Sequence, residues 1–146
     1  MKLLQLPLVA LLATTALAQN CVIGGPKNGT HVKPGKNITV EVDRPDSLTG
    51  STEVAIIIGF MSCVGFPNSQ CPPPDELIGS VLYNGPYNPQ FHTNVTPTKP
   101  PYQNFSVMIP TTARKGVAQL SVTHVSLVGA GPFPLLESLN VSLIVQ

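Results

Sequence analysis

The sequence predicts an all-β protein with an immunoglobulin-like β-sandwich of about seven or eight strands. Hydrophobic residues recur with a period of two in most segments, which is the pattern of half-buried strands. The 146 residues include 16 prolines and 12 glycines, and proline is excluded from helix interiors because it lacks a backbone donor. Turn residues separate the alternating segments at short intervals, as they do in small sandwich domains.

The alternation is clearest in the segments 37–43, 104–109 and 138–145, where apolar and polar side chains exchange faces at each residue. The run Val54–Met61 is continuously apolar and rich in β-branched residues, which indicates a strand covered on both faces. A shorter strand is expected at Ile78–Tyr83. The remaining expected strands are short edge strands, at 21–23 and 30–32.

The segment Ala118–Val128 changes its pattern along its length. Apolar residues occupy even positions from Ala118 to Val122, then odd positions from Val125 to Leu127. A change of parity within one strand is typical of a β-bulge or of a strand that changes sheet. The sequence therefore predicts such an irregularity near Thr123-His124.

The first 18 residues are typical of a secretory signal peptide. A short positive start precedes an apolar stretch from Leu3 to Leu12, and Ala16-Leu17-Ala18 has the small-x-small pattern that signal peptidase cleaves. A membrane anchor would need about 20 apolar residues, and a glutamine and a proline interrupt this run. We expect cleavage before Gln19, which leaves a single secreted, extracellular domain over residues 19–146 without a membrane span.

Charge excludes one class of partner. The chain has eight basic and seven acidic side chains, so it has no basic excess with which to bind the phosphates of a nucleic acid.

Five Asn-x-Ser/Thr sequons support secretion, because N-linked glycans would solubilise a surface that has few charges. The candidate glycosylated residues are Asn28, Asn37, Asn94, Asn104 and Asn140.

The three cysteines are Cys21, Cys63 and Cys71, and pairing is the rule in an oxidising compartment. Cys63 and Cys71 flank a short segment with glycine, proline and asparagine, so we expect a disulfide between them. Pairing of Cys21 with either of the others is the alternative. Cys21 as a catalytic thiol is disfavoured, because no histidine lies near it in the sequence.

No catalytic or cofactor-binding motif is recognisable. The three histidines, His31, His92 and His124, show no metal-ligand spacing with one another or with a cysteine or carboxylate. Glu41 and Asp43 stand two residues apart on one strand, which gives them similar solvated surroundings rather than the unequal ones of a glycosidase pair. We expect a non-enzymatic protein with no metal and no cofactor.

Aromatic residues gather in and beside the long proline-rich segment 84–101. Exposed rings with few charges around them suit a protein partner or a sugar. The alternative is that these rings attach the segment to the sandwich. The candidate partner-binding residues are Tyr83, Tyr87, Phe91 and Tyr102.

Several segments resemble small secreted fungal proteins of the necrosis-inducing secreted effector family (Nis-type proteins). The resemblance covers most of the chain after residue 18, and it is carried by the segments Pro34–Pro45, Ser51–Gly59, Val81–Phe91, Lys99–Ser106 and Ser126–Pro134. It implies a secreted effector that binds host proteins, namely receptor-associated immune kinases, and thereby suppresses plant defence or induces cell death. A carbohydrate-binding or cell-wall-binding module, or a structural surface protein, is the alternative.

Overall fold

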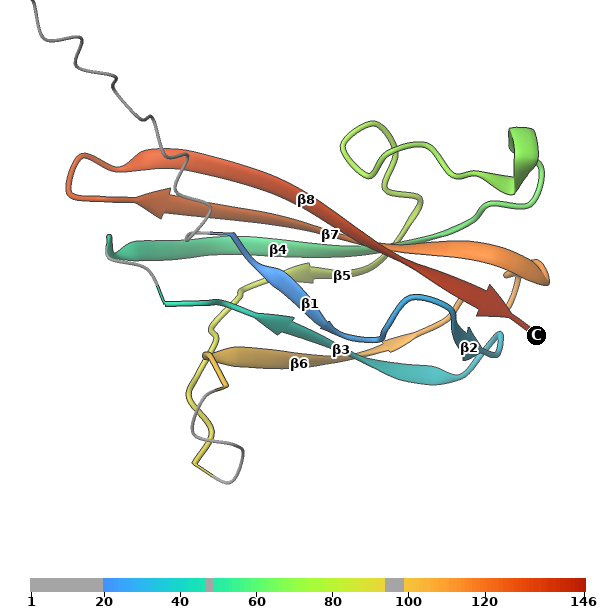
Figure 1. The fold of residues 1–146 in the computed structure, drawn as a ribbon, viewed down its shortest axis with the longest axis horizontal. Helices are drawn as coiled ribbons and strands as arrows, with labels where there is room; N and C mark the ends of the chain where they lie inside the picture. The colour runs from blue at the N-terminus through green and yellow to red at the C-terminus, as the bar shows by residue number, and fades with distance from the viewer. Residues whose placement is uncertain (1–19, 47–48, 94–98) are drawn as a thin grey trace, which may run out of the picture.

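The computed structural model describes residues 20–46, 49–93 and 99–146 (Figure 1), so the expected signal peptide lies outside the described residues. The described part forms eight strands and one short 3-10 helix. The strands are β1 (Val22–Gly25), β2 (Thr30–Val32), β3 (Asn37–Asp43), β4 (Ser51–Ser62), β5 (Ser80–Gly85), β6 (Tyr102–Met108), β7 (Gly116–Val128) and β8 (Phe133–Val145), and the helix is η1 (Pro67–Ser69). The prediction of an all-β sandwich is confirmed.

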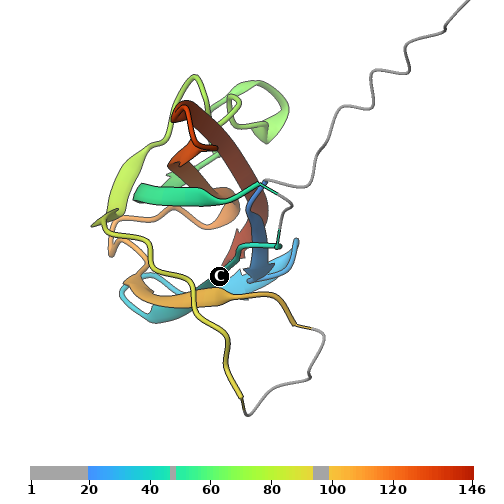
Figure 2. The ribbon, with the colours of Figure 1, turned by 90° about the vertical axis from the view of Figure 1, so that its left-hand side faces the viewer.

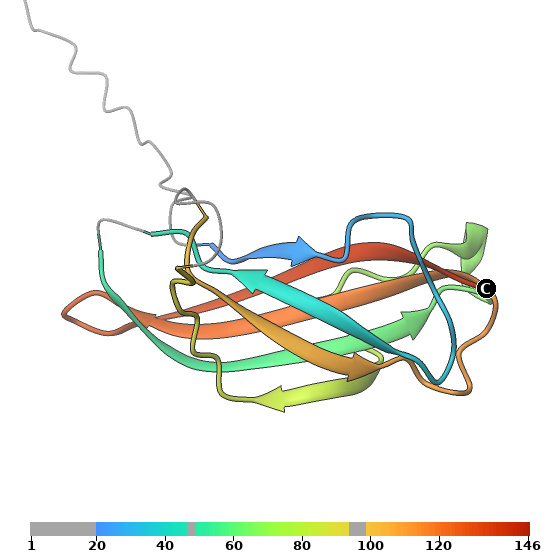
Figure 3. The same cartoon turned by 90° about the horizontal axis from the view of Figure 1, so that it is seen from below.

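The strands form two sheets that lie face to face (Figures 2 and 3). The smaller sheet has the order β1-β3-β6, and the larger has the order β2-β8-β7-β4-β5. All pairs are antiparallel except β2, which joins β8 in parallel. The two short edge strands expected near the N-terminus therefore lie in different sheets.

The core lies between the sheets and follows the predicted periodicity. Val40 and Val42 point inward from β3, opposite Ile58 of β4 and Leu120 of β7, and none of these four side chains has exposed surface. Burying one such aliphatic side chain contributes about 1.5–3 kcal/mol relative to leaving it in water.

The irregularity expected near Thr123-His124 of β7 lies elsewhere. β7 pairs with β8 without interruption, and its even-numbered residues face the core throughout. The irregularity lies in the partner strand β4, between Glu53 and Ala55. Apolar residues change parity in β7 because its inner positions become polar at His124 and Ser126, both fully buried.

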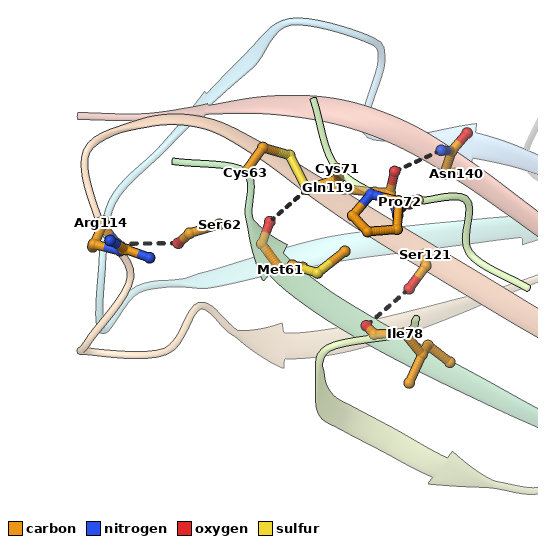
Figure 4. Close-up of a disulfide and its surroundings, with 10 residues drawn as sticks. All are labelled: Met61, Ser62, Cys63, Cys71, Pro72, Ile78, Arg114, Gln119, Ser121 and Asn140. Atoms are coloured by element: carbon orange, nitrogen blue, oxygen red, sulfur yellow. Dashed lines mark hydrogen bonds between the residues drawn. A yellow bond between two sulfur atoms is a disulfide. The ribbon is translucent and has the colours of Figure 1, made fainter. Parts of the chain in front are cut away.

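The segment 72–79, which follows the disulfide Cys63–Cys71 and is called the covering segment, lies over part of the outer face of the larger sheet (Figure 4). Gln119 donates a hydrogen bond to the carbonyl of Pro72 over 3.2 Å, and Ser121 donates one to the carbonyl of Ile78 over 3.3 Å. These contacts bury Gln119 and Ser121 although both point away from the core. The two-sided burial expected for Val54–Met61 holds at its C-terminal half, whereas Val54 is exposed.

Gly59 permits this covering segment to approach β4. A Cβ at position 59 would overlap the carbonyl oxygen of Ile78 and lie 2.8 Å from Ser121 Oγ. Gly59→Ala should therefore lower the free energy of unfolding by about 1–3 kcal/mol, as overpacking does elsewhere. Urea unfolding followed by circular dichroism measures this loss. Gly50→Ala is the matched control, because a Cβ there meets nothing within 4 Å; equal effects of the two substitutions would contradict the prediction.

Candidate functional site

A cluster of buried polar side chains occupies one end of the sandwich, and we call it the polar cluster. Its members come from both sheets and from the connections at that end. They are Cys21 before β1, Arg44 after β3, Glu53 on β4, Tyr87 after β5, His124 on β7 and Glu137 on β8. Buried charges are costly unless they are paired, so the polar cluster is the unusual feature of this core.

His124 lies at the centre of the polar cluster with no exposed surface. Its Nδ1 is 3.2 Å from Cys21 Sγ and 3.6 Å from Glu137 Oε1, and its Nε2 contacts Glu53 Oε2. The β4 bulge turns the Glu53 side chain inward, so that it lies beside this ring. Two carboxylates thus face opposite sides of one imidazole.

Arg44 and Tyr87 complete the polar cluster around His124. Arg44 Nε donates to Glu53 Oε1 over 3.0 Å and its Nη2 donates to Ser51 Oγ over 2.9 Å. The Tyr87 hydroxyl donates to the carbonyl of Val42 over 3.2 Å and lies 3.9 Å from Cys21 Sγ. The Tyr87 ring meets the His124 ring edge to face, with centroids 5.2 Å apart. These contacts join the two sheets through polar groups.

The environment shifts the ionisation of these groups. Burial alone would lower the pKa of His124, but its contacts with Cys21, Glu137 and Glu53 outweigh burial and raise the pKa to about 11. Burial alone would raise the pKa of Glu53, but His124 and Arg44 lower it to about 2. Burial raises the pKa of the Cys21 thiol and also that of Tyr87. Near neutral pH, His124 and Glu53 therefore form an ion pair.

The order thiol, imidazole, carboxylate is also the order of a cysteine nucleophile with its base and orienting group. Such a nucleophile needs substrate access and a thiol of depressed pKa. Here Cys21 is 2% exposed and its thiol pKa is raised by burial. The polar cluster as it stands does not offer a reactive thiol to a substrate.

Of the three cysteines, Cys63 and Cys71 are joined in a disulfide and Cys21 is free and buried. The histidines do not meet one another: His31 lies on β2, His92 stacks against Tyr102, and His124 lies in the polar cluster. Sequence reasoning missed the meeting of His124 with Cys21 because 103 positions separate them. The only signal was the loss of apolar residues from the inner positions of β7.

The prediction that the aromatic residues in and beside the segment 84–101 form a binding surface needs correction. Tyr87 is 3% exposed and Tyr102 is 7% exposed, so these two rings do not form the accessible binding surface that the sequence suggested. Tyr83 packs against Phe105 with centroids 4.7 Å apart and donates its hydroxyl proton to the carbonyl of Pro86. Phe91 remains accessible, at 66% exposed. Three of the four rings thus attach the segment to the sandwich.

The candidate glycosylation sites in the described residues are all exposed: Asn28, Asn37, Asn104 and Asn140. Asn94 lies outside the described residues. Asn37 and Asn104 lie on the solvent face of the smaller sheet, and Asn140 lies on that of the larger sheet. Glycans at these positions would leave the core undisturbed.

Glu41 and Asp43 lie on β3, with Lys99 beside them. Lys99 Nζ donates to Glu41 Oε1 over 2.7 Å, and burial together with the nearby Glu41 charge raises the pKa of Asp43. Their surroundings differ more than the sequence suggested. A partly buried ion pair of this kind serves to hold the segment that contains Lys99 against the smaller sheet.

A shallow apolar groove lies on the outer face of the larger sheet, next to the part that the covering segment protects. Ile57, Leu77 and Leu136 supply much of its apolar lining, and Asp75 and Glu76 also line it. Leu136 is 69% exposed and Leu77 is 44% exposed. Exposed aliphatic side chains with charged residues beside them are typical of a surface that contacts a protein.

Comparison with known proteins places the chain in a family. Among the described residues, no helix is long and apolar enough to cross a membrane. A search of curated proteins found no match to the chain. The model of the Nis1 family matches residues 17–144. That match includes the polar cluster, the disulfide and the groove, and it covers most of the sequence, so the chain belongs to the Nis1 family.

Proposed function

We propose that this chain is a secreted, non-enzymatic, effector-like protein that binds a host protein through the groove beside Leu136. The proposal rests on the family match and on the resemblance to necrosis-inducing secreted effectors, which implies receptor-associated immune kinases as partners. Binding would suppress plant defence or, at high abundance, induce cell death. The disulfide supports secretion, because such bonds persist mainly in oxidising compartments.

The open groove is the observation that carries the proposal. Ser121 and Gln119, farther along the same face, are covered by the segment 72–79, whereas Leu136 and Leu77 are left exposed. An aliphatic patch that Asp75 and Glu76 also line favours a partner segment that combines an apolar anchor with basic side chains. The buried thiol of Cys21 supports binding rather than catalysis.

The test is expression of the chain in plant tissue, with and without its first 18 residues, followed by capture of associated kinases and measurement of the elicited oxidative burst. Leu136→Lys places a positive charge in the groove and should weaken capture at least tenfold, which equals about 1.4 kcal/mol. Met108→Lys is the matched control, because Met108 is 53% exposed on the smaller sheet.

The proposal predicts that the wild-type chain and Met108→Lys lower the burst and that Leu136→Lys does not. Equal activity of the two variants would show that the groove is not the contact surface. Retention of the wild-type chain on insoluble glucan or chitin, with no effect on the burst and no cell death, would contradict the effector function. That result would favour the cell-wall-binding alternative.

A further inference from the structure

Three donor atoms of different chemistry converge inside the polar cluster. Cys21 Sγ, His124 Nδ1 and a carboxylate oxygen of Glu137 all lie within 4.8 Å of one another. Sγ and Nδ1 are 3.2 Å apart, and Nδ1 and Oε1 are 3.6 Å apart. Around a tetrahedral zinc ion, neighbouring sulfur, nitrogen and oxygen ligands lie roughly 3.4–3.6 Å apart. The two spacings that involve Nδ1 are close to those between ligands of one tetrahedral metal ion, and the sulfur and the carboxylate oxygen are within 4.8 Å of each other.

Glu137 provides a second, independent observation. Its side chain is 9% exposed, and its Oε2 is buried without a hydrogen-bond partner among the described residues. The other oxygen, Oε1, already accepts the backbone N–H of Cys21. A buried carboxylate oxygen left in this way is costly, and a cation between Glu137 and its neighbours would satisfy it.

His124 is held in the orientation that a metal ligand needs. Glu53 contacts Nε2 and so directs Nδ1 toward Cys21 and Glu137. Metal-binding histidines commonly have such a carboxylate on the second ring nitrogen, because it sets the tautomer and makes the ligand more basic. Arg44 in turn fixes Glu53 through its bond to Oε1.

We propose that Cys21, His124 and Glu137 bind one divalent metal ion of the zinc class, with Glu53 as a positioning residue. A mixed sulfur, nitrogen and oxygen donor set suits zinc, whereas calcium and magnesium prefer oxygen alone. The charges balance: a divalent ion and Arg44 oppose the Cys21 thiolate, Glu137 and Glu53, beside a neutral imidazole. A bound metal deprotonates a coordinating thiol outright.

The bound ion has a structural consequence. Cys21 immediately precedes β1 of the smaller sheet, whereas His124 and Glu137 lie on β7 and β8 of the larger sheet. The metal would link the two sheets at the point where the described chain begins. Entry of the ion requires only local opening beside Cys21, since β1 pairs with β3 alone.

The test uses the intact secreted chain, stripped with a chelator and then titrated with zinc sulfate. We expect one zinc ion per chain by equilibrium dialysis with elemental analysis, together with a raised melting temperature. With cobalt(II) in place of zinc, a thiolate-to-cobalt absorption band should appear. Only Cys21 can produce it, since the other two cysteines are in the disulfide. The cobalt measurement needs no variant, so a folding failure cannot obscure the result.

Substitutions then distinguish the proposed zinc ligands from residues that only lie near them. Cys21→Ser and Glu137→Gln should each weaken zinc binding by at least tenfold, and Glu53→Gln should weaken it by about 10–100-fold. Tyr87→Phe is the matched control, because it removes a hydroxyl 3.9 Å from the thiol but no ligand, and it should bind zinc as the wild type does. Failure of the wild-type chain to bind zinc, or cobalt binding without the thiolate band, would overturn the proposal.

Discussion

Glu53→Ala should lower the free energy of unfolding by about 3–5 kcal/mol, the loss typical of removing one partner from a buried ion pair. The Glu53 carboxylate contacts His124 Nε2 and accepts a hydrogen bond from Arg44 over 3.0 Å. The Glu53 side chain is 14% exposed, and those of His124 and Arg44 are 0% and 8% exposed. Removing the carboxylate takes away the anion that Arg44 and His124 share in a nearly dry site.

This loss is large against the total stability of a domain of this size, which is about 5–15 kcal/mol. Urea unfolding followed by circular dichroism at neutral pH, with a chelator present so that no metal contributes, measures it. Glu53→Gln retains the shape and loses the charge, so it should fall between the wild type and Glu53→Ala.

Glu76→Ala is the matched control, since Glu76 is an exposed carboxylate in a loop. Its effect should stay within about 0.5 kcal/mol. If Glu53→Ala unfolded at the same urea concentration as Glu76→Ala, the buried ion pair would not stabilise the fold. If Glu53→Gln were as damaging as Glu53→Ala, loss of charge rather than loss of packing would account for the whole effect.

The strands could be predicted because one face of each sheet is buried. In β3, for example, Ile38, Val40 and Val42 face the core, and Asn37 lies on the opposite face, as the alternation requires. The same rule failed in β7, where the inner face is apolar only as far as Val122. The next two inner residues, His124 and Ser126, are polar, whereas the apolar residues Val125 and Leu127 face outward, and this change imitates a bulge.

The polar cluster could not be predicted, because its members are brought together only by the pairing of distant strands. His124 lies opposite Glu137 in the β7–β8 ladder, and a bulge in β4 turns Glu53 toward the other side of the His124 ring. Neither the register nor the bulge has a signature in the sequence near Glu53. Tyr87 illustrates the same limit: its ring looks like one more loop aromatic, but its hydroxyl reaches Val42 inside the sandwich.

Removing the disulfide with the double substitution Cys63→Ser and Cys71→Ser should lower the free energy of unfolding by about 2–3 kcal/mol. The bond closes a loop with a sequence separation of 8, and the chain-entropy model gives this magnitude for so short a loop. Urea unfolding measures it. Gln70→Ala is the matched control, because Gln70 is an exposed side chain within the same loop, and it should change stability by less than about 0.5 kcal/mol.

Removing the disulfide should loosen the structure near it in addition to lowering the stability of the whole domain. The disulfide fixes the start of the covering segment, and the carbonyls of Pro72 and Ile78 hold it to Gln119 and Ser121 (Figure 4). Without the disulfide, the amide of Leu77, which donates to the carbonyl of Pro73, should exchange with solvent hydrogen faster. Amides around His124, at the far end of β7, should keep their protection. Equal acceleration at both places would mean that the whole sandwich opens instead.

Loosening of the covering segment also bears on partner binding, because Leu77 and the acidic residues beside it form one wall of the groove. A mobile wall must be ordered again when a partner binds, and that ordering opposes binding. The double variant should therefore bind the proposed host partner more weakly than Gln70→Ala does, although Leu136 is unchanged. Retained affinity with lowered stability would show that the strands alone form the contact surface and that the disulfide serves only the fold.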